Sequence, residues 1–126
     1  DLVLKYHNMI DIAVFPSIEE SFGVSVLEAS ACGKPVIVSN VGGLPEVAED
    51  GKTGFIVEKE NPDAIALALE KFISNPELKN EFGKNGRNKV VNEYNWQKSV
   101  SQMISIYDEI YRLNNYQKIN IQVEKN

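Results

Sequence analysis

Two acidic residues flank a glycine turn in the first quarter of the chain. Glu20 lies in a polar loop, Gly23 follows three residues later, and Glu28 lies five residues beyond the glycine. Gly23 stands where an apolar segment begins, so the backbone N–H groups of Phe22, Gly23 and Val24 can face outward with little obstruction. Free N–H groups at the amino end of a helix attract phosphate, and carboxylates accept hydrogen bonds from sugar or ribose hydroxyls. The pattern indicates a site for a ligand that carries both groups.

The residues alone leave two interpretations of these carboxylates open. A helix that begins near Gly23 places Glu28 about one and a half turns from its amino end, close enough to share a ligand site there. Glu28 lies between Leu27 and Ala29 in an otherwise apolar segment, so burial of its carboxylate would require a partner. In the other interpretation Glu28 faces solvent, and Glu20 is an acidic residue favoured by the helix dipole.

The elements that hold these residues alternate between apolar runs and helical segments. Continuous apolarity is typical of strands that are buried on both faces of a parallel sheet. Such runs predict strands over residues 12–15, 36–38 and 55–57. A helix is predicted after each, which gives an α/β fold with a Rossmann-like parallel sheet and flanking helices. A doubly wound domain typically has about six strands, so we expect one half of such a domain.

Turn residues set the expected ends of these helices. A first helix is expected to end near Asn8, and the helix over residues 24–31 is expected to stop at Gly33. A short helix is expected over residues 44–49. Asn61 is expected to cap a helix that begins at Pro62. That helix turns an apolar stripe toward the core, made up of Ile65, Leu69, Phe72 and Ile73.

The carboxyl-terminal part is predicted to be helical as far as Leu113. Residues 76–94 are weakly patterned as a helix, and Gly83 and Gly86 lower its helix propensity. Residues 96–113 show the clearest amphipathic pattern, with a stripe formed by Val100, Met103, Ile104, Tyr107, Ile110 and Tyr111. We expect an ordered domain over residues 1–113 and a polar tail over residues 114–126.

Composition and charge exclude several classes of protein. The 126 residues are 43% hydrophobic and 25% charged, as in a globular domain. A net charge of −5 with two arginines argues against a nucleic-acid partner. The single cysteine fits a reducing compartment, and no apolar stretch approaches the ~18 residues of a membrane helix. The chain begins without a signal peptide pattern or an initiator Met, so we expect a fragment of a cytoplasmic protein.

Four other positions carry weaker signals. His7 is the single histidine and is interpreted as a residue near a helix end rather than a catalytic or metal-binding one. Cys32 is interpreted as packed rather than reactive. Lys34 lies at the far end of the helix that carries Glu28 and is interpreted as a turn residue. The pair Gly42–Gly43 lacks the third glycine of a dinucleotide-binding turn, so it is interpreted as a loop.

Residues 20–29, Glu-Ser-Phe-Gly-Val-Ser-Val-Leu-Glu-Ala, resemble the Glu-x7-Glu motif of retaining GT-B glycosyltransferases in the "glycosyl transferases group 1" family. The resemblance continues in order over roughly residues 1–112, and this is more specific than an acidic pair. Its segments are residues 11–17, 31–37, 42–46, 50–57 and 94–96. It implies that residues 1–113 are the second half of the carboxyl-terminal domain, which binds a nucleotide-sugar donor.

The resemblance also implies roles for the two carboxylates. Glu20 would contact hydroxyls of the transferred sugar in the catalytic centre, and Glu28 would bind the ribose hydroxyls of the nucleotide. The implied reaction transfers a sugar from a nucleotide-sugar to a glycan or lipid with retention of anomeric configuration, as in polysaccharide biosynthesis.

The turn between the carboxylates would bind the diphosphate. By the same resemblance, backbone amides of Phe22, Gly23 and Val24 approach the sugar and diphosphate, and Ser25 adds a hydroxyl hydrogen bond to phosphate. Helix-end N–H groups stabilise a diphosphate leaving group without proton transfer. The family is independent of metal, and the sequence has no Asp-x-Asp metal motif, so we expect neither metal nor cofactor.

The resemblance places several functional parts upstream of these residues: a Lys/Arg pair that neutralises the diphosphate, the base-reading segment and the amino-terminal acceptor domain. The isolated chain is therefore expected to be inactive, and to self-associate through the uncovered strand at residues 12–15. The acceptor could lie at a membrane surface, which adds a peripheral location to the cytoplasmic one.

A non-catalytic binding or interaction module on the same half-domain scaffold is the alternative function. A flavodoxin-like receiver is disfavoured, because it would need an acidic cluster at the strand ends and five strands.

Overall fold

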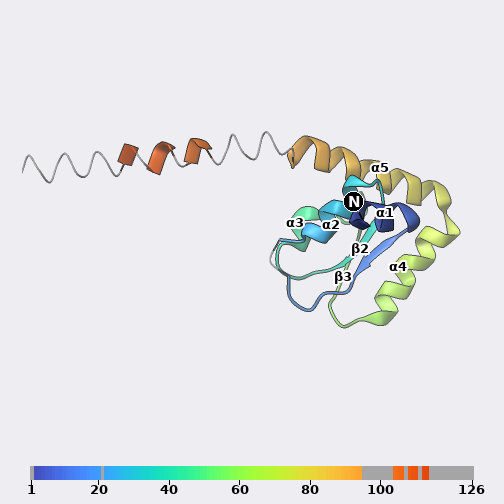
Figure 1. Cartoon of the computed structure of the whole chain (residues 1–126). Helices are drawn as coiled ribbons and strands as arrows, with labels where there is room; N and C mark the ends of the chain where they lie inside the picture. Colours follow the sequence, from blue (N-terminus) through green and yellow to red (C-terminus); the bar gives the residue numbers. More distant parts are fainter. Residues whose placement is uncertain (1, 21, 95–103, 107, 111, 114–126) are drawn as a thin grey trace, which may run out of the picture. The chain divides into compact units, whose positions relative to one another are not determined.

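A parallel sheet with helices on both faces forms the core of the protein (Figure 1). The computed structural model describes residues 2–20, 22–94, 104–106, 108–110 and 112–113. The chain divides into two units, residues 1–93 and 94–126. The first unit contains, in chain order, α1 (Leu2–Met9), β1 (Ala13–Phe15), α2 (Val24–Ala31), β2 (Val36–Ser39), α3 (Leu44–Val47), β3 (Gly54–Val57), α4 (Pro62–Ser74) and α5 (Pro76–Glu93).

The sheet has the order β1-β2-β3, with both neighbouring pairs parallel. Val36 of the central strand pairs with Ala13 on one side and with Gly54 on the other. All four residues of β2 are buried, whereas β1 and β3 are partly buried. This arrangement confirms the predicted α/β fold with a parallel sheet.

The central strand divides the hydrophobic core into two layers. Val36 and Val38 belong to the cluster formed with α2 and α3, while Ile37 belongs to the cluster formed with α4 and α5. The alternation follows from the strand period of two, which points successive side chains to opposite faces. In Figure 1, α2 and α3 accordingly lie on one side of the sheet and α4 on the other.

Helix α4 begins as predicted, and Ile65, Leu69 and Phe72 of its predicted stripe pack in the core. The side chain of Asn61 accepts a hydrogen bond from the Ala64 amide at 3.0 Å, which confirms the cap. Phe72 is buried, but Ile73 is 72% exposed, so the prediction that Ile73 faces the core is wrong. Each helical residue advances by about 100°, so Ile73 lies that far round from Phe72 and beyond the surface of the sheet. Ala68 is buried on this face instead.

Helix α5 runs unbroken through both of its glycines. A methyl group at Gly83 would lie 2.1 Å from the carbonyl oxygen of Gly33, and one at Gly86 would lie 3.4 Å from Ser30. The two glycines are buried and allow α5 to approach α2 closely. The interpretation of Gly83 and Gly86 as helix-weakening residues missed this packing role.

The carboxyl end of α2 lies at this contact with α5 and stops at Gly33. Gly33 has a φ of 73°, and the amide of Lys34 donates to the carbonyl of Ala29 at 3.1 Å. This is the hydrogen bond of a left-handed glycine stop, as predicted for Gly33. The guanidinium of Arg87, on α5, donates to the carbonyl of Ala31.

In the second unit, residues 104–106, 108–110 and 112–113 are helical, which agrees with the predicted helix over 96–113. Ile104 and Ile110 of its stripe are exposed. The other stripe residues, Val100, Met103, Tyr107 and Tyr111, lie outside the described residues, as does the predicted tail over 114–126. Among the described helices, none is both long and apolar enough to cross a membrane.

Candidate functional site

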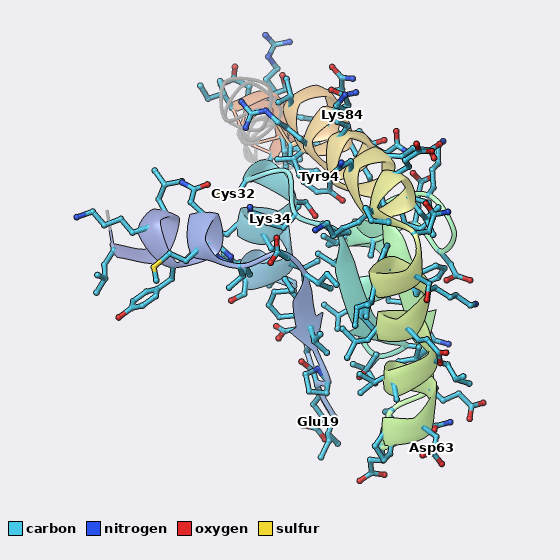
Figure 2. The ribbon with its side chains drawn as sticks, turned by 90° about the vertical axis from the view of Figure 1, so that its right-hand side faces the viewer. Glu19, Cys32, Lys34, Asp63, Lys84 and Tyr94 are labelled. Atoms are coloured by element: carbon cyan, nitrogen blue, oxygen red, sulfur yellow. The ribbon has the colours of Figure 1, made fainter. Side chains whose placement is uncertain are left out.

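The candidate site lies where β1 ends and the loop over residues 16–23 leads into α2. In Figure 2, Glu19 lies beyond the arrowhead of β1, toward the same end as Asp63 at the start of α4. Cys32 and Lys34 lie at the other end of the sheet. Lys34 is therefore far from the site, as its interpretation as a turn residue requires. Ligands of open parallel sheets bind at the carboxyl end of the strands, which is the end that Glu19 marks.

A tight turn joins Glu20 to the amino end of α2. Gly23 is the residue before the helix and has a left-handed backbone, with φ 69° and ψ 41°. Its amide donates a long hydrogen bond of 3.4 Å to Oε1 of Glu20, and its carbonyl accepts from the Leu27 amide at 3.1 Å. The carboxylate of Glu20 therefore folds back onto the start of the helix.

The exposed face of α2 carries the other predicted residues. Val24, Ser25 and Glu28 are exposed, as is Phe22 before the helix, while Val26 and Ala29 face the core. Glu28 lies three and four residues after Ser25 and Val24, so the three share one face. Because helical side chains lean toward the amino end, the Glu28 carboxylate lies over the preceding turn. The helix places Glu28 in solvent and excludes its burial.

The first-turn amides of α2 complete the site. An α-helix has no intrahelical acceptors for its first amides, here those of Val24, Ser25 and Val26. The arrangement joins backbone donors suited to an anion with two carboxylates suited to hydroxyl groups.

The loop after β2 supports this turn from the side. Gly42 has a φ of 51°, and a methyl group there would lie 1.6 Å from the carbonyl oxygen of Glu20. A methyl group at Gly23 would lie 2.7 Å from Cδ2 of Leu44, the first residue of α3. Close contact with a loop that follows the next strand thus holds the Glu20–Gly23 turn. The paired glycines directly after a strand were the available signal for this role.

The contact of His7 with Glu28 is a second one that could not be found from the sequence. Its Nε2 lies 3.6 Å from Oε2 of Glu28, which joins α1 to α2. The His7 side chain is 15% exposed and that of Glu28 is 45% exposed. The interpretation of His7 as a residue near the end of a helix is correct in position, because α1 ends at Met9. It did not include this partner.

The described residues offer no metal-binding cluster, and one surface cavity lies apart from the predicted site residues. Within the described residues, no group of three or more His, Cys, Asp and Glu side chains is placed to hold a metal ion. A surface cavity of about 340 Å³ lies between β3 and α4, lined in part by Phe55, Leu67 and Lys71. None of the predicted site residues lines it.

Comparisons with a family model and with known proteins agree on one family. Residues 1–89 match the family model described as "Glycosyl transferases group 1". The uncharacterized glycosyltransferase MJ1178 of Methanocaldococcus jannaschii is 36% identical over 110 residues, which are 87% of this chain and 31% of the relative. The capsular polysaccharide biosynthesis glycosyltransferase CapM of Staphylococcus aureus is 38% identical over 105 residues, 83% of this chain and 28% of the relative. The chain spans less than a third of the length of these relatives.

Solved structures show the same fold. Sucrose-phosphate synthase from Thermosynechococcus elongatus aligns with a TM-score of 0.82 at 35% identity, over 86% of this chain and 27% of that one. The carboxyl-terminal domain of the group 1 family protein LpcC from Francisella tularensis aligns with a TM-score of 0.67 at 34% identity, over 71% and 46%. Anabaena HepE in complex with UDP-glucose, at 21% identity and a TM-score of 0.82, shares the fold over 85% and 30%.

Proposed function

Because this chain belongs to the glycosyl transferases group 1 family, as a portion of its carboxyl-terminal domain, we propose that it binds the nucleotide-sugar donor of a sugar-transfer reaction. The complete enzyme transfers the sugar to a glycan or lipid acceptor and retains the anomeric configuration. An acceptor domain and the diphosphate-neutralising Lys/Arg pair belong to the remainder of such an enzyme. The 126 residues without them are inactive in transfer.

One observation carries this proposal: the Glu20 carboxylate meets the Gly23 amide at the start of a helix whose exposed face bears Glu28. The diphosphate fits the amino end of α2, where backbone N–H groups and the helix dipole favour negative charge. Glu20 then precedes the diphosphate-binding turn in the sequence, and Glu28 follows it. Glu20 accepts hydrogen bonds from the sugar, and Glu28 accepts them from the ribose.

In the proposed reaction, the turn before α2 stabilises the diphosphate leaving group. The bond between the anomeric carbon and the phosphate oxygen breaks, its electron pair leaves with the diphosphate, and the acceptor hydroxyl oxygen bonds to the same carbon. The proton of that hydroxyl passes to the departing diphosphate. Negative charge grows on the diphosphate as this happens, so fixed N–H donors at the amino end of α2, such as those of Val24 and Ser25, favour the transition state. Contacts of Gly42 and Leu44 with the turn keep these donors in place before the donor sugar arrives.

Glu20→Ala and Glu28→Ala, made in the full-length polypeptide, test the assignment. Loss of a hydrogen bond to a charged group costs about 1.5–3 kcal/mol, so Glu28→Ala is expected to weaken nucleoside diphosphate binding at least about tenfold. Glu20→Ala is expected to lower the turnover of the nucleotide-sugar more than its binding. UDP-glucose, the ligand of HepE, is the first donor to test, followed by GDP- and ADP-sugars.

Glu70→Ala is the matched control, because Glu70 is an exposed glutamate on α4, away from the site. An ordinary surface substitution changes free energies by no more than about 0.5 kcal/mol. If Glu28→Ala matches this control in calorimetric titrations with UDP, GDP and ADP, Glu28 is a plain surface residue and the ribose assignment is wrong.

A further inference from the structure

We propose that His7 is a positioning residue: it holds the carboxylate of Glu28 so that a free oxygen of that group faces the nucleotide ribose. This inference rests on the proposed function, because it assumes that Glu28 is the ribose ligand. Nε2 of His7 lies 3.6 Å from Oε2 of Glu28, across the interface between α1 and α2. The imidazole does not touch the ligand and acts through Glu28.

The burial of the two side chains shows which one is held by the fold. The His7 side chain is 15% exposed and lies in the last turn of α1, so its position is set by packing. The Glu28 side chain is 45% exposed and projects from the exposed face of α2, where a glutamate ordinarily samples several rotamers. The contact with the packed His7 side chain therefore restricts the rotamers of Glu28.

The geometry leaves the carboxylate able to bind. A carboxylate has two oxygens, and contact through Oε2 leaves Oε1 to accept a hydrogen bond from a ribose hydroxyl. Fixing the rotamer in advance removes an entropic cost that binding would otherwise carry, which corresponds to about fivefold in affinity for one long side chain. The imidazole at this distance limits the rotation of the carboxylate.

The test measures the contribution of the ribose hydroxyls directly. The dissociation constant of a nucleoside diphosphate is compared with that of its 2′,3′-dideoxy analogue, with UDP, GDP and ADP as the three probes. The ratio of the dideoxy analogue's dissociation constant to that of the nucleoside diphosphate reports contacts to the hydroxyls and is insensitive to the diphosphate. It is measured in the full-length polypeptide for wild type, His7→Ala, Glu28→Ala and the double variant.

The expected result is that His7→Ala lowers this ratio about fivefold and leaves the affinity for the dideoxy analogue unchanged. In the Glu28→Ala background, His7→Ala has no further effect on the ratio, because the group that it positions is absent. His7→Gln retains a side-chain N–H donor and restores part of the ratio. Lys5→Ala, an exposed change on the same helix, leaves the ratio at the wild-type value.

Two outcomes overturn the inference and are distinct from a failure of the proposed function. Equal weakening of both ligands by His7→Ala means that His7 only supports the fold. An unchanged ratio in His7→Ala, together with a lost ratio in Glu28→Ala, means that Glu28 binds the ribose without help from His7. An unchanged ratio in Glu28→Ala instead removes the ribose assignment, and the role of His7 with it.

Discussion

Two glycines with a left-handed backbone determine the shape of the candidate site. Gly23 places the first turn of α2 against Leu44, and Gly42 brings the loop after β2 onto the Glu20 carbonyl. At both positions the backbone has a positive φ, and at both a methyl group would come under 3 Å from a neighbouring atom. The site therefore depends on two residues that contribute no side chain.

Gly42→Ala is expected to disturb the turn that carries Glu20. The left-handed backbone costs any residue with a Cβ about 1–2 kcal/mol, and here the methyl group also collides with the backbone of Glu20. Thermal unfolding should show a loss greater than this range, together with weaker binding of nucleoside diphosphate.

Gly51→Ala is the control for the backbone term, because Gly51 has a φ of 75° and no described atom lies within 4 Å of the added methyl group. It should lose stability within the range of about 1–2 kcal/mol and keep its ligand affinity. Equal losses in the two variants would show that the loop does not support Glu20.

Helix α2 is the element on which the site is built, and α5 fixes its position. Gly83 faces the Gly33 carbonyl at the end of α2, and Arg87 donates to the carbonyl of Ala31 one turn further along α5. These contacts locate the carboxyl end of α2, and the Gly23 contact with α3 locates its amino end.

Gly83→Ala is therefore expected to have two opposite effects on the stability of the protein. Helix propensity favours alanine over glycine by about 1 kcal/mol, but a methyl group at this position would lie 2.1 Å from a backbone oxygen. The backbone contact is expected to dominate, so that Gly83→Ala lowers the midpoint of thermal unfolding. Gly86→Ala places its methyl group 3.4 Å from Ser30, an ordinary contact, and should leave the midpoint close to wild type or raise it. A higher midpoint for Gly83→Ala would contradict the close packing.

The two edges of the sheet differ across the molecule as a whole. At β3, the Ile56 amide donates to Oδ1 of Asp50 at 2.9 Å, which occupies a donor on that edge. At β1, the described residues place no strand beside the edge opposite β2. Helix α1 exposes large apolar side chains, namely Leu2, Leu4, Tyr6 and Met9. An open edge beside exposed apolar surface favours association.

The purified 126-residue chain is therefore expected to form dimers or larger species. Sedimentation velocity over a range of concentrations measures this. Met9→Glu, which places a charge on the exposed face of α1, should shift the population toward monomer, whereas Ile73→Glu on α4 should have a smaller effect. A monomer whose sedimentation coefficient is independent of concentration would show that the edge at β1 is covered.

Local patterns were enough to predict the strands and the caps of several helices. Apolar runs predicted β1, β2 and β3, while Asn61 and Gly33 marked a helix start and a helix end. These features depend on neighbouring residues, because a cap, a turn or a helical repeat involves atoms within a few positions of each other. The contact of Glu20 with the Gly23 amide belongs to the same class, since the two residues lie three positions apart.

Contacts between distant segments could not be predicted in this way. His7 meets Glu28, Gly42 meets Glu20, and Gly83 meets Gly33, each across a strand or a helix that separates the partners in the sequence. Periodicity states which face of an element is apolar but not which neighbour covers it, and for the same reason it misplaced Ile73 at the edge of its stripe. The parallel crossovers bring these residues together, so their partners follow from the packing of the helices on the sheet.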